Sequence, residues 1–397
     1  MPTSSIDASA GAPALSTLTT MRVGGAPERL VRPATEAQLV ETTRAVWASG
    51  EPWLLLGGGS NTVASDEGFD GTVIRVATRG IERLDDRAGS DGAGEDRSAV
   101  HLRVQAGESW DGLVEHAVRS GLAGIEALSG IPGSVGAAPV QNIGAYGQEL
   151  SSALVAIDFL DYDSGELCRL SAAQLGLGYR TSALKRGLTG VVLAVELRLT
   201  ADAAAAEAHG TPLGAPVAYG QLADALGVGL GDRVPLAEVR RAVLALRASK
   251  GMVLDDADPD SVSAGSFFTN PIVGENYARS LPSDAPRWPV TPPEPSMIVP
   301  LETAAAAPHT LGARTLGVQH PVKLSAAWLI EKSGIRRGFA LPGSRAAISS
   351  KHTLAITNRG GATAAEIVQL AAYVQLRVQS EFGLLLQPEP VLVDLEL

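Results

Sequence analysis

The sequence predicts an α+β protein, in whose first half strands outnumber helices. Apolar and polar residues alternate over segments such as 100–106 and 191–200, as they do in half-buried strands. Two glycine-rich stretches interrupt this pattern: the short 57–59 and the long 130–147, which holds five glycines and two prolines. A strong amphipathic helix is expected at 363–382, because its apolar residues recur at helical spacing.

Composition limits the classes of function that fit this chain. Of its 397 residues, 45% are hydrophobic and 19% are charged, which is an ordinary globular balance. The formal net charge of −11 argues against nucleic acid as a partner, because binding to nucleic acid relies on basic patches. The single cysteine, Cys168, excludes an intramolecular disulfide and a cysteine-based metal site. It lies in an alternating segment, so we expect a buried or half-buried thiol and no bound metal.

No segment has the features of a membrane span or of a secretory signal. No run of about 18 apolar residues occurs in the chain. Residues 1–14 contain neither a basic nor an apolar region. We therefore expect a cytoplasmic protein that does not contact a membrane.

Local signals predict four helices. Thr35 and Thr363 each begin a capping box, Ser109 is an N-cap, and Pro235 opens a helix because its fixed φ suits the first turn. Glycines or a change of pattern mark the ends of these segments. The expected helices are 35–49, 109–120, 235–249 and 363–382.

Strands are predicted from alternation and from turn signals. The turn 163–165 (Asp-Ser-Gly) joins two alternating segments and indicates a hairpin. The segment 53–56 is short and apolar, which favours a buried strand that leads into the first glycine stretch. The expected strands are 53–56, 72–77, 100–106, 154–162, 166–170, 191–200 and 391–397.

Composition changes along the chain predict its domains. Residues 201–208 are rich in alanine and mark a boundary, while 85–97 and the proline-rich 279–313 are expected to be loosely structured insertions. The predicted organisation is a disordered N-terminus at 1–16, a first domain at 17–204, a second domain at 205–388 and a terminal strand at 389–397.

The two glycine-rich stretches are the clearest functional signal in the residues themselves. Glycine lets a backbone approach a ligand closely and adopt positive φ. Successive N–H groups in such a loop form a concave site for an anion. Two phosphate-type loops far apart in sequence suggest that the chain binds one large, extended dinucleotide. Neither loop matches the Rossmann fingerprint or the Walker lysine loop.

Three residues outside these loops could carry chemistry, and each has a plainer interpretation. Ser266, between a glycine and two phenylalanines, is a possible proton donor or a simple turn residue. Arg180 follows a tyrosine and could stabilise a carboxylate or an enolate, or form a surface salt bridge. Glu389 is held between two prolines of fixed φ, which suits a positioned acid or a solvated turn.

A fourth candidate is Lys250, which follows the helix expected at 235–249. That helix carries Arg240, Arg241 and Arg247, so this region could meet a diphosphate. The alternative is a basic helix face that is simply solvated.

In this order, the segments resemble the UDP-N-acetylenolpyruvoylglucosamine reductases, a family of bacterial flavoenzymes. The matching motifs extend over residues 19–390, nearly the whole chain. The long glycine stretch and the Gly-Ser-Phe-Phe motif form the most specific pair. The motifs lie at 20–25, 56–61, 131–136, 141–147, 178–180, 264–271, 322–330 and 387–389.

The resemblance implies a fold and a reaction. The fold is a two-part FAD-binding domain of the p-cresol methylhydroxylase (vanillyl-alcohol oxidase) type, at 17–204, with an α+β substrate-binding domain at 205–388. The reaction is the NADPH-dependent, FAD-mediated reduction of UDP-N-acetylglucosamine enolpyruvate to UDP-N-acetylmuramate, in the synthesis of peptidoglycan precursors. Hydride would pass from N5 of the reduced flavin to C3, and a proton from Ser266 to C2. FAD would be held tightly but not covalently, and the enzyme is expected to be a monomer.

The resemblance also implies roles for individual residues. The catalytic residues would be Arg180, Ser266 and Glu389. The sequence around Tyr219 indicates the subtype with a mobile tyrosine-bearing loop, whereas the match near His352 is loose. The expected FAD contacts are Gly57, Gly58, Gly59, Ser60, Asn61, Ile131, Pro132, Gly133, Ser134, Gly136, Asn142 and Gly144. The expected substrate contacts are Tyr219, Lys250, Asn270 and Lys323.

Two other functions are alternatives to the reductase. An FAD-dependent oxidase of the same cofactor fold would be favoured by a residue placed to hold flavin covalently, and Cys168, His101 and His116 are poor candidates for that. A flavin scaffold without turnover would be favoured by the loss of a catalytic residue, but all three are present.

Overall fold

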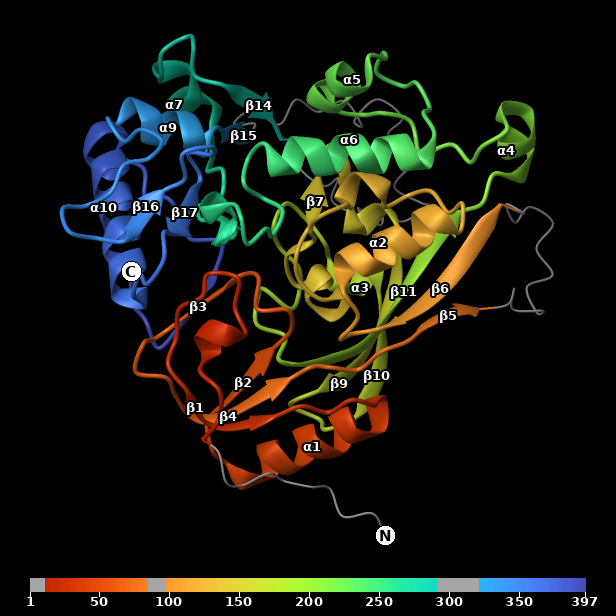
Figure 1. Ribbon diagram of the computed structural model, residues 1–397, viewed down its shortest axis with the longest axis horizontal. Coiled ribbons are helices and arrows are strands. Elements are labelled where there is room, and N and C mark those ends of the chain that lie inside the picture. The colour runs from red at the N-terminus through yellow and green to blue at the C-terminus, as the bar shows by residue number, and fades with distance from the viewer. Residues whose placement is uncertain (1–10, 85–97, 291–320) are drawn as a thin grey trace, which may run out of the picture. The chain divides into compact units, whose positions relative to one another are not determined.

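The computed structural model describes residues 11–84, 98–290 and 321–397 (Figure 1). The chain folds into two compact units. The boundary expected at residues 204–205 does not coincide with the division between them, because residues 205–267 belong to unit 1. Unit 1 consists of Met1–Phe267, Arg337–Ala372 and Pro390–Leu397, and unit 2 of Phe268–Arg336 and Tyr373–Glu389.

A parallel sheet of three strands, in the order β1-β4-β2, opens unit 1. Its strands are β1 (Pro27–Val31), β4 (Phe69–Arg75) and β2 (Trp53–Leu56). Helix α1 (Glu36–Ser49) lies along this sheet (Figure 1). Leu39 of the helix is fully buried in the main hydrophobic core of the unit, which β4 also enters.

The starts of the first two helices confirm Thr35 and Ser109 as N-caps. The capping box expected at Thr35 forms only in part, because the Gln38 side chain accepts from the N–H of Ala34 and not from that of Thr35. The Thr35 hydroxyl accepts a hydrogen bond from the N–H of Gln38, and Gly50 ends α1 at a φ of 70°. Ser109 caps α2 (Trp110–Arg119) in the same way. These ends form where predicted because capping depends on residues only three or four apart.

The main core of unit 1 lies against a five-stranded antiparallel sheet, ordered β10-β9-β11-β6-β5. The predicted hairpin is confirmed, because β9 and β10 pair antiparallel. Cys168, on β10, is half-buried as expected. The strands are β5 (Ile81–Leu84), β6 (Ala99–Gln105), β9 (Leu154–Asp161), β10 (Leu167–Ser171) and β11 (Gly190–Thr200).

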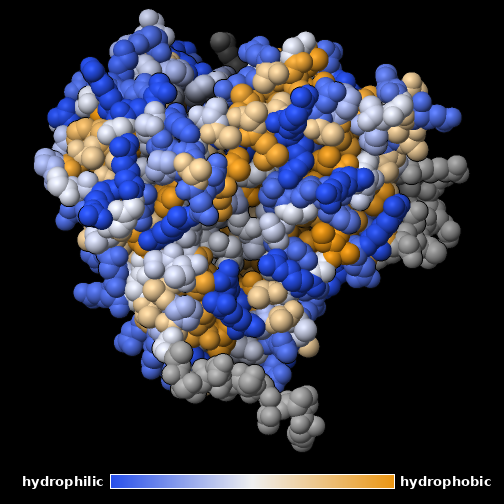
Figure 2. Space-filling model, viewed as in Figure 1, coloured by the Kyte–Doolittle hydropathy of each residue, from blue (hydrophilic) through white to orange (hydrophobic). Residues whose placement is uncertain are grey.

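The described part of unit 1 also contains several other helices and short strands. The alanine-rich transition expected at 201–208 contains a helix, α4 (Ala203–His209). Figure 2 shows hydrophobic and hydrophilic residues interleaved on the face that carries α2, α5 and α6. The remaining helices are α3 (Ala172–Leu175), α5 (Gly220–Leu226) and α6 (Leu236–Ala248), and short 3-10 turns lie at η1 (Leu15–Thr17), η2 (Glu126–Leu128), η3 (Val135–Gln141), η4 (Leu150–Ser152) and η5 (Pro259–Ser261). The remaining strands pair as β3 (Thr62–Ala64) with β18 (Val391–Val393), β7 (Gly144–Ala145) with β8 (Gln148–Glu149), and β12 (Ser263–Ser266) with β17 (Ala355–Asn358) and β16 (Ala346–Ile348).

Helix α10 (Ala364–Phe382) has the apolar face that the sequence predicted. Thr363 and Glu366 form its capping box, each accepting a hydrogen bond from the other's backbone N–H. The residues of the predicted face, which are all fully buried, are Ile367, Leu370, Ala371, Val374 and Val378.

Unit 2 is a small α+β unit. Its antiparallel sheet has the order β13-β15-β14, with strands β13 (Ile272–Gly274), β15 (Pro321–Leu324) and β14 (Arg287–Pro289). The described part of unit 2 also contains helices α7 (Glu275–Ser280) and α9 (Ala326–Lys332) and the residues Tyr373–Phe382 of α10.

Two expectations about unstructured segments are partly wrong. Leu15 was placed in a disordered N-terminus, but its side chain is only 1% exposed and packs in a core cluster with Leu18 and Val73. The proline-rich insertion was placed at 279–313, but Arg287–Pro289 forms strand β14 because β15 offers it an antiparallel partner. Residues 1–10, 85–97 and 291–320, to which the rest of these expectations apply, lie outside the described residues.

Candidate functional site

The two glycine-rich stretches face each other across a very short distance. A Cβ atom added to Gly58 would lie 2.6 Å from the Cα of Gly133, and one added to Gly57 would lie 2.4 Å from the Ser134 hydroxyl oxygen. The Ser60 hydroxyl donates a 2.9 Å hydrogen bond to the carbonyl of Pro132 and so ties the loops together. Only glycine permits this approach of two backbones.

The first glycine loop fits an anionic group such as the pyrophosphate of FAD. Within the described residues, no acceptor binds the backbone N–H groups of Gly57, Gly58 and Gly59. Gly59 has a φ of +63°, and a Cβ there would lie 2.0 Å from the carbonyl oxygen of Leu18. Several unsatisfied N–H groups in one glycine loop provide the donors that a phosphate accepts.

Arg180 lies on a tight turn against the segment 141–147. Its Nη2 donates to the carbonyl of Gly144 at 3.0 Å, and its Nη1 to the carbonyl of Asn142 at 3.4 Å. Gly178 and Thr181 exchange backbone hydrogen bonds across the turn, which places Arg180 at a φ of +51°. The structure thus brings the predicted catalytic arginine to two predicted FAD contacts.

Asn142 uses its whole side chain to build this region. Its amide nitrogen donates to Glu149 at 2.9 Å and to the carbonyl of Gly178 at 3.1 Å, and its amide oxygen accepts from the N–H of Ser151 at 2.9 Å. Asn142 is 1% exposed, so its role in the structure is to hold the Arg180 turn against the β7–β8 hairpin.

Left-handed backbone conformations are concentrated around the Arg180 turn and the segment 141–147. Among the described residues, five that are not glycine have positive φ, and three of them are Asn142, Tyr146 and Arg180. Such conformations are costly for residues with a Cβ atom and are typical of functional sites.

Ser266 ends strand β12 after an irregularity in its pairing with β17. Gly265, at a φ of +75°, lies within that irregularity, and Ser266 pairs with Ala355. Phe267 and Phe268 follow and are fully buried, while Ser266 itself is partly exposed. Within the part of the chain that the structure describes, no residue hydrogen-bonds the Ser266 hydroxyl, which leaves it available to a ligand.

Three of the predicted residues belong to unit 2: Glu389, Asn270 and Lys323. Pro388, beside the partly exposed Glu389, forms a β-bridge with Phe268. The amide oxygen of Asn270 accepts a 2.9 Å hydrogen bond from the N–H of Ala326, so it caps the start of α9. The Lys323 ammonium lies 5.9 Å from the centre of the Trp288 ring.

Tyr219 and Lys250, the predicted substrate contacts of unit 1, both contact the ring of Tyr146. The rings of Tyr219 and Tyr146 are in edge contact, with centroids 5.9 Å apart. The Lys250 ammonium lies 5.3 Å from the centre of the Tyr146 ring and donates to the side-chain oxygen of Gln221 at 2.8 Å. Burial lowers the pKa of Lys250, and the charge of Arg247 lowers it further. The sequence predicted no role for Tyr146, although this residue lies in the matching motif 141–147.

Arg247 is the clearest functional candidate that sequence reasoning missed. It was assigned to a basic helix face for which solvation was the plainer interpretation, yet it is only 9% exposed and its Nε has no hydrogen-bond partner among the described residues. It lies four and eight residues after the buried Val243 and Val239, and this spacing could have predicted its burial. Its Nε would be 3.4 Å from a Cβ on Gly130, at the start of the second glycine loop. A buried, unsatisfied guanidinium N–H beside this loop fits an anionic ligand.

The other two arginines of α6 differ from Arg247. Arg240 forms two hydrogen bonds with the carboxylate of Asp111, at 2.6 and 3.0 Å, and the same carboxylate accepts the N–H of Gly130 at 2.6 Å. Burial raises the pKa of Asp111, but these hydrogen bonds outweigh it and hold the pKa below its usual range. Arg241 is exposed, as expected of a solvated helix face.

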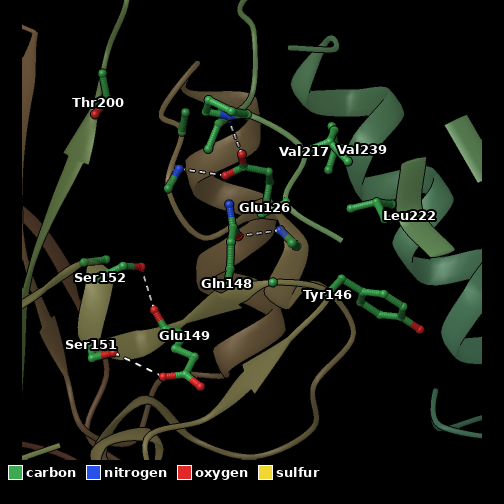
Figure 3. Close-up of a pocket in the computed structure, with 18 of the residues that line it drawn as sticks. Glu126, Tyr146, Gln148, Glu149, Ser151, Ser152, Thr200, Val217, Leu222 and Val239 are labelled. Atoms are coloured by element: carbon green, nitrogen blue, oxygen red, sulfur yellow. Dashed lines mark hydrogen bonds between the residues drawn. The ribbon is translucent and has the colours of Figure 1, made fainter. Parts of the chain in front are cut away.

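A cavity of about 540 Å³ in unit 1 borders this region (Figure 3). None of the predicted site residues lines it. Tyr146 connects the two places, because it lines the cavity and also contacts Tyr219 and Lys250. The cavity is therefore a neighbour of the predicted site and not the place where the catalytic residues gather.

The described ranges hold neither a candidate metal cluster nor a candidate membrane span. No group of three or more His, Cys, Asp or Glu residues there is arranged to hold a metal ion. No helix in the described part of the chain is both long and apolar enough to cross a membrane.

Family models match both halves of the chain. Residues 27–171 match a model described as an FAD binding domain. Residues 258–393 match a model described as the C-terminal domain of UDP-N-acetylenolpyruvoylglucosamine reductase. The first match includes both glycine loops, and the second includes Ser266 and Glu389.

Whole-chain relatives carry the same description. The UDP-N-acetylenolpyruvoylglucosamine reductase of Leifsonia xyli subsp. xyli is 64% identical, over 97% of this chain and 99% of the relative. That of Saccharopolyspora erythraea is 45% identical, over 97% and 95%. A crystal structure of the Thermus caldophilus reductase (MurB) aligns with a TM-score of 0.56 and 26% identity, covering 96% of this chain and 97% of that one.

Proposed function

The chain belongs to the UDP-N-acetylenolpyruvoylglucosamine reductase family, and from that premise we propose how its residues carry out the reaction. The substrate is UDP-N-acetylglucosamine enolpyruvate, and the product is UDP-N-acetylmuramate, a precursor of peptidoglycan. The enzyme is an oxidoreductase that holds FAD and takes its electrons from NADPH.

One observation carries the assignment of the site. Arg180 donates to the carbonyls of Asn142 and Gly144, and these belong to the same stretch, 130–147, whose other end faces the loop 57–61. The residues that suit an anionic cofactor and the arginine that suits an anionic reaction centre are therefore joined in one framework. The cofactor residues proposed are those of 57–61 and 131–136, with Asn142 and Gly144.

FAD held by these residues would supply, once reduced by NADPH, the hydride for C3 of the enolpyruvyl group. Addition of that hydride would place negative charge on C2 and its carboxylate. The planar guanidinium of Arg180 offers several N–H donors to that charge, and its two carbonyl partners keep it oriented. Glu389 is proposed to assist at the same carboxylate.

Ser266 is proposed to protonate C2. A serine hydroxyl is a very weak acid, so it can donate only to a strongly basic carbanion-like centre, which hydride addition creates. Its hydroxyl has no partner within the described residues, and two fully buried phenylalanines follow it. Both features suit a proton donor that is held away from bulk water.

Tyr219, Lys250, Asn270 and Lys323 are proposed to bind the UDP part of the substrate. Lys250 supports this role best, because its ammonium donates to the neutral amide of Gln221 and lies near the buried charge of Arg247. Two nearby cations favour a diphosphate. The domain boundaries at 17–204 and 205–388, the cytoplasmic location, the monomeric state and the mobility of the loop with Tyr219 remain predictions.

The direct test is NADPH oxidation by the FAD-loaded protein, followed by absorbance with and without UDP-N-acetylglucosamine enolpyruvate. We expect oxidation that requires the sugar nucleotide. Oxidation that requires only oxygen would instead support the FAD-dependent oxidase, which the comparisons do not favour. A protein that holds no flavin would refute the assignment of the glycine loops.

A further inference from the structure

Glu126 is a buried carboxylate that the reaction does not use. It is 1% exposed and lies in the short turn η2, just before the long glycine stretch. Both of its carboxylate oxygens accept backbone N–H groups, from Gly124 at 2.6 Å and from Ala215 at 2.5 Å. Figure 3 shows the carboxylate between these two nitrogen atoms, at the wall of the cavity.

Ala215 belongs to the stretch that carries Tyr219, residues 213–219, here named the tyrosine segment. This segment runs antiparallel to residues 231–235: Gly214 donates to the carbonyl of Val234, and Val217 to that of Asp232. Arg233 also donates to the carbonyl of Gly214, at 2.9 Å. All of these bonds connect the segment to residues beyond 230.

Within the described residues, the Glu126–Ala215 contact is the one hydrogen bond from the tyrosine segment to any residue before 200. Hydrogen bonds to a charged group are the stronger kind, and this one is shielded from water. Gly214 leaves room for it, because a Cβ there would lie 3.0 Å from the Glu126 oxygen. In the described part of the chain, the hydrogen bonding between the segment and the part of unit 1 before residue 200 is thus made by one carboxylate.

The cavity gives the segment space to move when that contact is broken. Val217 of the segment and Leu222 of α5 line the cavity on one side. The hairpin residues Tyr146 and Gln148 line it on the other. Apolar packing with Ala127 and Val239 holds the segment in this region, but apolar packing has no direction. The directional restraint on its position comes from the Glu126 oxygen.

We propose that Glu126 is a positioning residue, which sets the affinity for the sugar-nucleotide substrate by holding Tyr219 against Tyr146. This inference rests on the proposed role of Tyr219 in binding substrate. It concerns binding and not chemistry, so the KM for the substrate should change while kcat and the reduction of flavin by NADPH should not.

The test compares full-length, FAD-loaded Glu126→Gln with the wild-type enzyme. The amide keeps the size of the side chain, but its NH₂ group faces one of the two backbone N–H groups. That backbone N–H is then left without an acceptor. We expect the KM for UDP-N-acetylglucosamine enolpyruvate to rise about five- to tenfold. This rise is smaller than the one that the full loss of a charge-assisted hydrogen bond would cause. We expect kcat within about twofold of wild type and faster hydrogen exchange at the Ala215 N–H.

Two further variants make the result specific. Ser152→Ala removes a hydrogen bond to the carbonyl of Glu149 from the same cavity wall, but this hydroxyl makes no bond to the tyrosine segment, so its KM should be that of wild type. Gly214→Ala crowds the Glu126 oxygen from the other side and should raise KM in the same direction. It also decides the question if Glu126→Gln does not fold.

An unchanged KM together with unchanged exchange at Ala215 would overturn the proposal. So would an equal fall in kcat and in the rate of flavin reduction, because that pattern indicates damage to the cofactor site. If the wild-type enzyme showed no turnover with the sugar nucleotide, the proposed function would fail. The exchange at Ala215 would still report whether Glu126 holds the segment.

Discussion

The guanidinium of Arg180 donates a 3.0 Å hydrogen bond to the backbone carbonyl of Gly144. A Cβ added to Gly144 would be crowded by the neighbouring strand, because it would lie 2.9 Å from the Cγ of Glu149 and 3.1 Å from the carbonyl oxygen of Gln148. Arg180 also donates to the carbonyl of Asn142, so main-chain oxygens hold the orientation of the proposed anion-stabilising group.

Replacing Arg180 with lysine should slow the step that follows flavin reduction. Lysine keeps the positive charge but lacks the planar fork that reaches both carbonyl groups. We expect the reoxidation of reduced flavin by the enolpyruvyl substrate to slow about 10²- to 10³-fold, measured by stopped-flow absorbance. Arg186→Lys is the control, because Arg186 donates to the carbonyl of Gly176 in a nearby turn and is exposed. Equal effects of the two substitutions would show that Arg180 acts only on the fold.

Replacing Ser266 with alanine should separate the two half-reactions. NADPH should reduce the flavin at the normal rate, because no proton from Ser266 is needed there. Reoxidation by the enolpyruvyl substrate should slow about 10²- to 10⁴-fold, the usual contribution of a general acid. Single-turnover absorbance of the flavin measures both steps. A normal rate of reoxidation would mean that another group protonates C2.

Replacing Gly58 with alanine should release FAD. The new methyl group would lie 2.6 Å from the Cα of Gly133, so the two loops must move apart. We expect a protein that is purified with much less flavin, quantified by its absorbance after denaturation. Gly165→Ala is the control, because its φ of +71° makes alanine costly by about 1 kcal/mol while no atom lies within 4 Å of the new Cβ. That variant should lose stability and keep its FAD; a Gly58→Ala protein that also kept FAD would contradict the proposed pyrophosphate site.

The pH dependence of substrate binding should report on Lys250. Burial and the charge of Arg247 both lower its pKa, so the ammonium loses its proton below the ordinary lysine value of about 10.4. Because the charged form is the one that attracts a diphosphate, the KM for the sugar nucleotide should rise as the pH increases through this pKa. In Lys250→Arg, which stays charged, the rise should move to higher pH. The same alkaline limb in both proteins would assign the titration to another group.

Replacing Asp111 with asparagine should destabilise unit 1 around the second glycine loop. The variant loses the charge that accepts two bonds from Arg240 and one from the N–H of Gly130. We expect a loss of about 1–2 kcal/mol in the free energy of unfolding at neutral pH, measured by urea denaturation of the FAD-loaded protein.

The same pair of proteins tests the sign of the pH effect. The pKa of Asp111 in the folded protein is lower than in the unfolded chain, so its contribution is present above the unfolded value of about 3.9. That contribution is lost as the pH falls through the folded pKa. The difference between wild type and Asp111→Asn should therefore shrink in strong acid; a difference that is constant with pH would show that the charge of Asp111 does not matter.

Local signals predicted much of the fold. The starts of α1, α2 and α10 follow from Thr35, Ser109 and Thr363, because a cap is made by residues within one turn of each other. The buried face of α10 follows from the spacing of its apolar residues. Strand β14 was missed because three residues form a strand only where a neighbouring strand, here β15, offers hydrogen bonds.

By itself, the sequence determined the family, the cofactor class and the identity of the proposed catalytic residues, because glycine loops and the Gly-Ser-Phe-Phe motif are local patterns of residue types. The tertiary structure was needed to show which of these patterns meet: the facing of Gly58 and Gly133, the contact of Arg180 with Gly144, the unmet hydrogen bond of Arg247 among the described residues and the contact of Glu126 with Ala215. Each joins residues far apart along the chain or depends on what surrounds a side chain. Helical spacing can predict that a side chain is buried, but which groups then lie beside it depends on how distant segments pack together, and no local pattern encodes that.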